Sequence, residues 1–369
     1  MAEREESRCK ASKSEKVKNK ILSICAMVLL LTAATEDKTT TIFMIGDSTM
    51  ANKDISGGKQ ERGWGMVLQS YFDDNIVIDN HAVNGRSSLS FINEGRWDKV
   101  LQKMKPGDYV IIQFGHNDEK PKADRHTDPG STFDYNLARF VRETREHGGI
   151  PILMNCVVRR NFGASPSPSE GGEPIGTKID DEALRNTTAS ATPSEGKGLV
   201  TPPSEGQGEA FLIDTHGLYS VAPRDVAQRM NCFFVDANQI THDLEQGLGV
   251  EASKKLHMWF LPGEEPSEPK GKQDNTHYSV YGAHVVARLL ADAICEEVPI
   301  LSKYRTNADI TVDRNGRGQY LELEPAVAAA LASAKAETVI QLLGGEWEKP
   351  KLPKKSKVKI VLREGARWK

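Results

Sequence analysis

The segment "IFMIGDSTMA" spans residues 42–51 and joins four apolar residues to Gly46, Asp47 and Ser48. A short apolar run that ends in small and polar residues is typical of a buried β-strand. A serine directly after such a strand is either a helix cap or a catalytic nucleophile. The rest of the chain has to decide between these two interpretations of Ser48.

Similar apolar runs recur along the chain, with helical patterns between them. We expect strands at 41–46, 76–79, 109–114, 150–154 and 232–237, and helices at 63–72, 134–149 and 278–298. Strands that alternate with helices predict an α/β fold, in which a parallel sheet is covered by helices on both faces.

Composition and charge fit a globular protein. The 369 residues are 38% hydrophobic and 27% charged, with a formal net charge of −3. The chain after residue 34 is more acidic than the whole, because residues 1–34 carry more Lys and Arg than Asp and Glu. A mildly acidic body has no broad attraction for nucleic acid or anionic lipid, so we expect neither as a partner. The oligomeric state stays open.

The first 34 residues have the pattern of a secretory signal peptide. Lys16, Lys18 and Lys20 precede an uncharged apolar run at 21–34, which ends in small residues. We therefore expect cleavage near Ala34, a secreted or periplasmic protein, and no membrane association after cleavage. The alternative is a buried first helix.

Five cysteines are present, of which Cys9 and Cys25 lie in the predicted signal peptide. The remaining Cys156, Cys232 and Cys295 are widely spaced and form no Cys-x-x-Cys pair, so we expect no disulfide framework. Cys156 and Cys232 lie in or beside apolar runs, which favours a place in the core.

Two segments interrupt the α/β pattern. Residues 163–210 are rich in Gly, Ser, Pro and Thr and contain "PSEG" three times, which predicts a disordered insertion. The tail, 300–369, is expected to form a strand, a Gly-rich turn, a helix and two further strands. Its segment "ITVDRNGRGQYLELEPAVAAA" resembles the start of a pectin methylesterase β-helix, which implies a truncated second domain without activity of its own.

Four polar blocks follow strands or precede the last helix of the sheet domain. They contain Ser48, Gly85, Asn117, and the pair Asp274 and His277. Because parallel strands share one carboxyl edge, these loops can converge there. His277 can act as the base for Ser48, and Asp274 can fix the tautomer of His277. The backbone N–H groups of Ser48 and Gly85 and the Asn117 amide are suitable donors for an oxyanion.

Each of these residues also has a structural interpretation. Ser48 and Asp274 could be helix caps, and Gly85 could simply occupy a turn. His216, in "DTHG", has an aspartate two residues earlier and is the best rival base.

Together, however, the blocks closely resemble the SGNH (GDSL-like) hydrolase superfamily, named for its Ser, Gly, Asn and His. The segment "GHND" at 115–118 matches the third block of that family. The resemblance implies a flavodoxin-like three-layer α/β/α fold. It also implies a catalytic triad of Ser48, His277 and Asp274, and an oxyanion hole of Ser48, Gly85 and Asn117.

A finer resemblance is to rhamnogalacturonan acetylesterases. It is carried by "GDSTMA" (46–51), "NHAVNGRSSLSFINEGRWDKV" (80–100), "GDYVIIQFGHND" (107–118), "PILMNCVVRRNF" (151–162) and "DNTHYSVYGAHVVA" (274–287). This resemblance implies removal of acetyl groups from a pectic polysaccharide. The insertion is a departure from that family.

A uronate-rich substrate needs cations near the site. Arg86 and Arg96 could bind uronate carboxylates, or they could form internal ion pairs. Trp97 could stack on a sugar, although we expect it in the core. The mechanism needs no metal or cofactor, and no ligand spacing indicates a metal site.

The sequence thus predicts a signal peptide at 1–34, a hydrolase domain at 35–299 that holds the insertion, and a C-terminal fragment at 300–369. We expect a secreted serine esterase acting on acetylated pectic polysaccharide. The alternatives are an acetylesterase on xylan or small esters, and a non-catalytic carbohydrate-binding protein.

Overall fold

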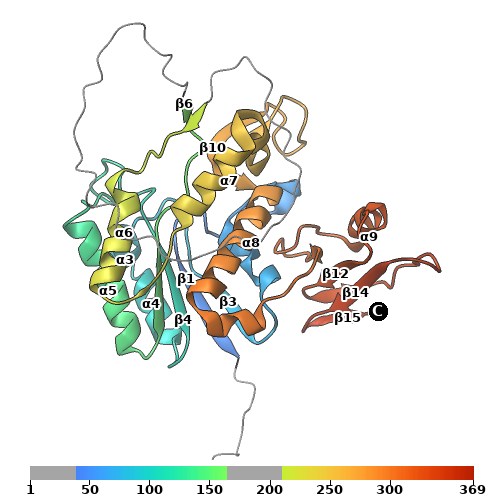
Figure 1. Cartoon of the computed structure of the whole chain (residues 1–369), viewed down its shortest axis with the longest axis horizontal. Helices are drawn as coiled ribbons and strands as arrows, with labels where there is room; N and C mark the ends of the chain where they lie inside the picture. Colours follow the sequence, from blue (N-terminus) through green and yellow to red (C-terminus); the bar gives the residue numbers. More distant parts are fainter. Residues whose placement is uncertain (1–38, 164–209) are drawn as a thin grey trace, which may run out of the picture.

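The opening strand is present as β1 (Thr40–Gly46), inside a five-stranded sheet. The computed structural model describes residues 39–163 and 210–369 (Figure 1). The predicted signal peptide and nearly all of the predicted insertion lie outside these residues. The sheet runs β3-β1-β4-β5-β8, and every neighbouring pair is parallel. Numbered along the chain, this order is 2-1-3-4-5, which is the flavodoxin-like order that the sequence resemblance implied.

The elements of the sheet domain alternate as predicted. The other sheet strands are β3 (Ile76–Asn80), β4 (Tyr109–Gln113), β5 (Ile150–Met154) and β8 (Phe233–Val235). The helices are α2 (Trp64–Val67), α3 (Ser88–Asn93), α4 (Arg96–Lys103), α5 (Thr132–Glu146), α6 (Leu218–Arg229), α7 (Ala237–Ala252) and α8 (Val280–Glu297). Short 3-10 turns occur at η1 (Ser56–Gly58), η2 (Leu68–Tyr71), η3 (Ser253–Leu256) and η4 (Pro299–Tyr304). The single helix expected at 63–72 is thus α2 followed by a 3-10 turn.

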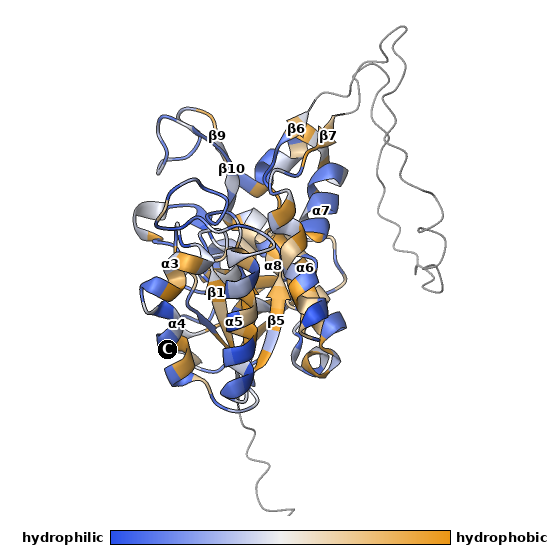
Figure 2. Cartoon of the chain, turned by 90° about the vertical axis from the view of Figure 1, so that its left-hand side faces the viewer, coloured by the Kyte–Doolittle hydropathy of each residue, from blue (hydrophilic) through white to orange (hydrophobic). Residues whose placement is uncertain are grey.

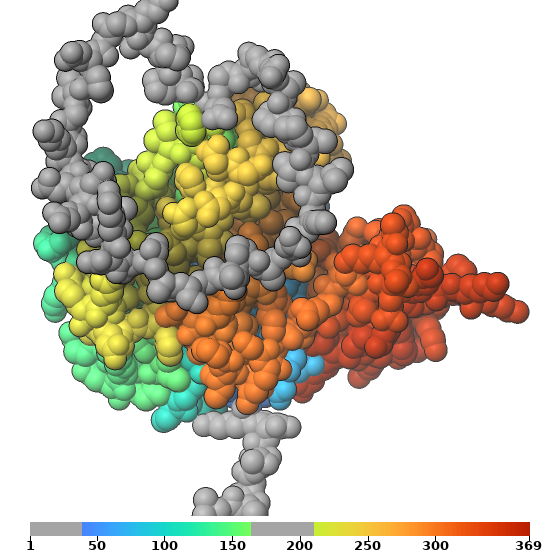
Figure 3. Space-filling model, viewed as in Figure 1, coloured from blue at the N-terminus to red at the C-terminus, as the bar shows by residue number. Residues whose placement is uncertain are grey.

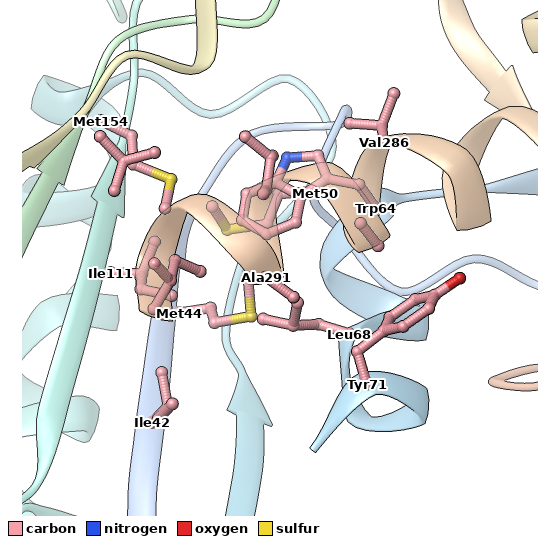
Figure 4. Close-up of a cluster of buried hydrophobic side chains, with 14 of the residues drawn as sticks. Ile42, Met44, Met50, Trp64, Leu68, Tyr71, Ile111, Met154, Val286 and Ala291 are labelled. Carbon is pink, nitrogen blue, oxygen red and sulfur yellow. The ribbon is translucent and has the colours of Figure 1, made fainter. Parts of the chain in front are cut away.

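Side chains of the sheet alternate between two cores, because successive residues of a strand point to opposite faces. Ile42 and Met44 of β1 belong to a buried cluster that also contains Trp64 and side chains of α8 (Figure 4). Phe43 and Ile45 pack on the other face, against α3, α4, α5 and α6. The apolar sheet between helices with polar outer faces is visible in Figure 2. The sheet is therefore buried on both sides, which explains its nearly continuous apolar strands.

A second sheet lies beside the start of α8. It joins β2 (Glu61–Arg62), β10 (Lys272–Ser279) and β9 (His257–Phe260), all antiparallel. We expected Asp274 and His277 in a loop, but both lie on β10. The cap of α8 is Ser279, whose Oγ accepts a hydrogen bond from the Gly282 N–H at 3.1 Å. The alternative interpretation of Asp274 as that cap is therefore wrong.

The two ends of the predicted insertion lie side by side. β6 (Phe162–Gly163) pairs antiparallel with β7 (Phe211–Leu212), so the chain leaves and re-enters the fold at neighbouring strands. Within the described ranges, no helix has both the length and the apolar character needed to cross a membrane.

The C-terminal residues form a unit with its own core. It comprises β11 (Ile310–Val312), α9 (Leu323–Ala332), β12 (Thr338–Leu342), β13 (Gly345–Trp347), β14 (Val358–Leu362) and β15 (Ala366–Trp368). β11, β12 and β14 pair in parallel, as do β13 and β15, around a cluster that buries Trp347. Successive parallel strands are the arrangement of stacked coils. The resemblance of this unit to a pectin methylesterase stays a prediction.

Candidate active site

Ser48 and Asn117 lie at the point where the order of the central sheet reverses. Ser48 follows β1 and Asn117 follows β4, and these two strands are neighbours. In open α/β sheets, ligands bind in the crevice at this switch point, outside the carboxyl ends of the strands. Gly46 permits the close approach of the strands, because a Cβ there would lie 2.8 Å from the carbonyl oxygen of Gln113.

Ser48, His277 and Asp274 form a continuous hydrogen-bonded chain. His277 Nε2 lies 2.9 Å from Ser48 Oγ, and His277 Nδ1 lies 2.8 Å from Asp274 Oδ2. Ser48 is half-buried, at the end of the strand that the sequence singled out. The structure therefore brings Ser48 together with two residues that lie more than half of the chain away from it.

A bulge in β10 presents Asp274 and His277 to the serine. The pairing of β10 with β9 shifts register between Gln273 and Tyr278. Bulges of this kind redirect side chains next to functional sites. Inside the bulge, Asp274 Oδ1 accepts hydrogen bonds from the backbone N–H groups of Thr276 and His277, each at 2.9 Å. One oxygen of the carboxylate thus shapes the bulge, while the other faces the imidazole.

The protonation state of Asp274 suits this geometry. Burial alone would raise the pKa of Asp274, but the hydrogen bonds from the ring and backbone of His277 hold the pKa well below its ordinary value. Asp274 is therefore ionised at neutral pH. A carboxylate that faces Nδ1 accepts its proton and leaves Nε2 free to accept one from Ser48.

Gly85 and Asn117 lie on loops that are tied together. The Asn117 amide nitrogen donates to the Arg86 carbonyl oxygen at 3.1 Å, which links the third block to the second. Lys120 Nζ donates to the Asn117 amide oxygen at 2.8 Å. An ammonium group can only donate, so Lys120 fixes the orientation of the amide. Gly85 has a φ of +75°, a conformation that favours glycine.

Asp118, the last residue of the third block, also connects the loop that contains Gly85 to the loop that contains Asn117. Its carboxyl group accepts hydrogen bonds from the Ser88 backbone N–H and hydroxyl and from the Thr127 hydroxyl. The residue is completely buried, and burial raises the pKa of Asp118 to about 7. This network sets the position of the Gly85 loop relative to Asn117.

Arg86 and Arg96 both form an ion pair with Glu94, and their role in substrate binding stays a prediction. Nε of each guanidinium donates to the same carboxylate oxygen, Oε2 of Glu94. About a third of each side chain remains exposed. Trp97 is buried and donates from Nε1 to Glu143, which confirms the expected core position.

His216, the rival base, has different partners. Its Nδ1 lies 2.9 Å from Glu119 Oε2, and its ring packs edge-on against His116 with centroids 4.4 Å apart. Glu119 also pairs with Arg159. Among the described residues, His277 is the only histidine that is hydrogen-bonded to the side chain of Ser48.

Three residues whose hydrogen bonds support the site were not identified from the sequence. Asp47 is completely buried and its Oδ1 accepts from the backbone N–H and hydroxyl of Thr49, which closes the turn that carries Ser48. Lys120 orients Asn117, and Asp118 joins the loops. A charged residue next to a motif is usually exposed, so only "GHND" itself could have indicated a role for Asp118. Across residues 39–163 and 210–369, no three His, Cys, Asp or Glu side chains cluster as metal ligands would.

Comparisons with known proteins find relatives that cover the part of the chain containing this site. A family model described as "GDSL-like Lipase/Acylhydrolase family" matches residues 44–285, a range that contains all five candidate catalytic and oxyanion residues. The chain is 32% identical to "Rhamnogalacturonan acetylesterase RhgT" of Bacillus subtilis, over 75% of this chain and 96% of that protein. It is 35% identical to "Probable rhamnogalacturonan acetylesterase YesY" of the same organism, over 69% of this chain and 92% of that protein. It is 36% identical to "Rhamnogalacturonan acetylesterase" of Emericella nidulans, over 66% of this chain and 93% of that protein.

Proposed function

Because the chain belongs to the GDSL-like lipase/acylhydrolase family and is thus a carboxylic ester hydrolase, we propose that it removes acetyl groups from rhamnogalacturonan. The resemblance drawn from the sequence blocks is confirmed at the level of the family. The substrate is proposed from three relatives whose names specify this activity.

The proposed reaction begins with Ser48. His277 Nε2 takes the hydroxyl proton while Oγ attacks the acetyl carbonyl carbon, and Asp274 stabilises the resulting imidazolium. The C–O bond to the sugar then breaks, and His277 returns the proton to the sugar oxygen. This leaves acetate esterified to Ser48. A water molecule, deprotonated by His277, attacks the same carbonyl carbon, the bond from this carbon to Ser48 Oγ breaks, and His277 returns the proton to Oγ, which releases acetate and free Ser48.

Each tetrahedral intermediate carries a negative oxygen. The proposed donors are the backbone N–H groups of Ser48 and Gly85 and the second N–H of the Asn117 amide. The assignment of these donors is supported by the hydrogen bonds that orient the Asn117 amide, from Lys120 and to the Arg86 carbonyl oxygen. Donors that are oriented before the reaction need no reorganisation when charge develops.

The observation that carries the proposal is the pair of contacts at His277, 2.9 Å to Ser48 and 2.8 Å to Asp274. The test is acetate release from acetylated rhamnogalacturonan by the full chain and by Ser48→Ala. We expect release by the first and none by the second, with unchanged thermal unfolding. Equal release by both would remove Ser48 as the nucleophile. A clear preference for acetylated xylan in a parallel arm would exclude the pectic substrate.

Secretion is a separate proposal, which rests on the basic and apolar pattern of residues 1–34. N-terminal sequencing of protein recovered outside the cytoplasm should begin after a residue close to Ala34. Recovery only inside the cell with Met1 retained would contradict it.

A further inference from the structure

A large groove lies between the hydrolase domain and the C-terminal unit. Its volume is about 1040 Å³, and its walls include Arg62, Trp259 and the first turns of α8 on one side and Gly318–Leu321 on the other. Figure 3 shows the C-terminal unit (red) against the side of the domain next to α8 (orange). The volume is at the upper end of the range for pockets that bury a drug-sized ligand. The groove therefore has room for an extended molecule.

A buried cation without a counter-charge lines this groove. Arg62 is only 3% exposed. Its guanidinium donates to the backbone carbonyl oxygens of Lys59, Glu61 and Gly316. Among residues 39–163 and 210–369, no carboxylate forms an ion pair with it. Burying a charge without a partner is costly, so an anionic ligand in the groove would stabilise this site.

Two further basic residues line the groove, against two carboxylates. Lys255 and Arg288 line it, are exposed, and form no ion pair with the described residues. The two lining carboxylates are already engaged, since Asp309 pairs with Lys335 and Glu264 accepts from a backbone N–H. The lining thus has an excess of positive charge that suits carboxylate groups.

The walls also present aromatic surface. Trp259, Phe260, Tyr281 and Tyr320 all line the groove, and Tyr281 is 59% exposed. Aromatic side chains offer a flat apolar face together with a polar edge. A ligand with flat apolar faces and carboxylates therefore matches this lining better than a simple anion does.

The groove borders β10, the strand that carries Asp274 and His277. Ser279 lines the groove and follows His277 by two residues on β10, which corresponds to about 7 Å along a strand. Trp259 Nε1 donates to Asn275 Oδ1 at 2.8 Å, inside the bulge that carries Asp274 and His277. A polymer bound in the groove would therefore lie beside the strand that positions the catalytic histidine.

We propose that this groove binds a stretch of acidic polysaccharide, with uronate carboxylates at the exposed Lys255 and Arg288, sugar rings on Trp259 and Tyr281, and the buried charge of Arg62 behind them. The role of this stretch as the continuation of an acetylated substrate chain rests on the proposed function. The binding itself rests only on the lining of the groove.

The test is binding of unesterified polygalacturonate by the full-length protein, measured by calorimetry and by affinity electrophoresis. The groove variant is Lys255→Glu with Arg288→Glu. The matched control is Lys99→Glu with Lys105→Glu, which makes the same charge change at two exposed lysines in and after α4, on the opposite face of the sheet. We expect the groove variant to bind at least tenfold more weakly, while the control binds like the wild type. We also expect Tyr281→Ala to weaken binding.

Equal binding by the groove variant and the control would overturn the proposal. So would binding of monomeric galacturonate as tight as binding of the polymer, because it would indicate a small-anion site. The ratio of kcat/KM for acetylated rhamnogalacturonan to that for p-nitrophenyl acetate should fall about tenfold in the groove variant. Groove-dependent binding without acetate release by the wild type would contradict the proposed function but support the groove. Acetate release without groove-dependent binding would support the proposed function but contradict the groove as a polysaccharide site.

Discussion

The two oxygens of Asp274 make separable contributions, and Asp274→Asn tests them. Oδ1 accepts from two backbone N–H groups of the bulge, at 2.9 Å each, and Oδ2 faces His277 Nδ1 at 2.8 Å. The asparagine amide oxygen can keep the first role. Its NH₂ group then faces Nδ1, which must accept rather than donate. The imidazole proton moves to Nε2, where it points at Ser48 and prevents His277 from acting as a base.

The hydrogen bonds inside the bulge determine how much kcat Asp274→Asn should lose. The asparagine could restore the active tautomer by flipping, but its NH₂ would then face the backbone N–H groups of Thr276 and His277. Leaving a buried donor without an acceptor costs about 1–3 kcal/mol, and both N–H groups are partly buried, so the flip costs at most about 6 kcal/mol. At about 1.4 kcal/mol per tenfold, kcat should fall by a factor of up to about 10⁴. The corresponding change in a serine-protease triad lowers kcat about 10⁴-fold.

The assay is the initial rate of acetate release, with thermal unfolding measured on the same samples. Asp274→Asn should keep the unfolding temperature of the wild type. Asp274→Ala should lose a similar amount of activity and also unfold at lower temperature, because it removes the acceptor for both backbone N–H groups. The double variant Ser48→Ala/Asp274→Asn should be no slower than Ser48→Ala alone, since the residues act as a unit. A folded Asp274→Asn protein within fivefold of wild-type kcat would refute this account of the tautomer.

Three further predictions follow from single contacts. Asn117→Ala should lower kcat about 10²–10³-fold with little change in KM, as expected for loss of one oxyanion donor, and a change in KM alone would place Asn117 in substrate binding instead. The pKa of Asp118 is raised to about 7 from 3.8, so the native state binds the extra proton and the free energy of unfolding should fall as pH rises from about 4 to about 7. Urea titrations should show this slope in the wild type but not in Asp118→Asn. Arg363→Ala removes hydrogen bonds to Asp74 and to the Phe72 carbonyl oxygen, and should cost about 1–3 kcal/mol of stability and expose the C-terminal unit to limited proteolysis.

The sheet and the strand-end residues were predictable because local patterns and one topological rule determine them. Apolar runs identified the strands, and parallel strands bring their carboxyl ends to one edge. Ser48 and Asn117 could therefore be assigned to the same crevice before any coordinates were known. His277 was placed there on the weaker expectation that the polar block before the last helix converges with the strand ends, and the resemblance to a family supported this expectation.

The supporting residues could not be predicted, because their roles depend on tertiary contacts. The segment of β10, "KQDNTHYS", is polar and lacks the apolar alternation of a half-buried strand, so it looked like a loop. Asp47, Asp118 and Lys120 are charged, and charged residues are exposed unless a folded neighbour provides hydrogen bonds. Arg86 and Arg96 share Glu94, a pairing that sequence spacing left as one of two equal alternatives.

The C-terminal unit shows how a segment without catalytic residues can still affect the site. Two hydrogen bonds join the unit to the hydrolase domain. Arg62 donates to the Gly316 carbonyl oxygen, and Ser70 donates to the Arg317 carbonyl oxygen. The unit therefore supplies one wall of the groove and also one of the three acceptors that hold the buried Arg62 guanidinium. Separating the unit would leave Arg62 with fewer acceptors and open the groove to solvent. β2 pairs directly with β10, and Arg62 lies opposite Tyr278, the residue that follows His277. Residues that line the groove and the candidate catalytic base thus lie on a single short sheet.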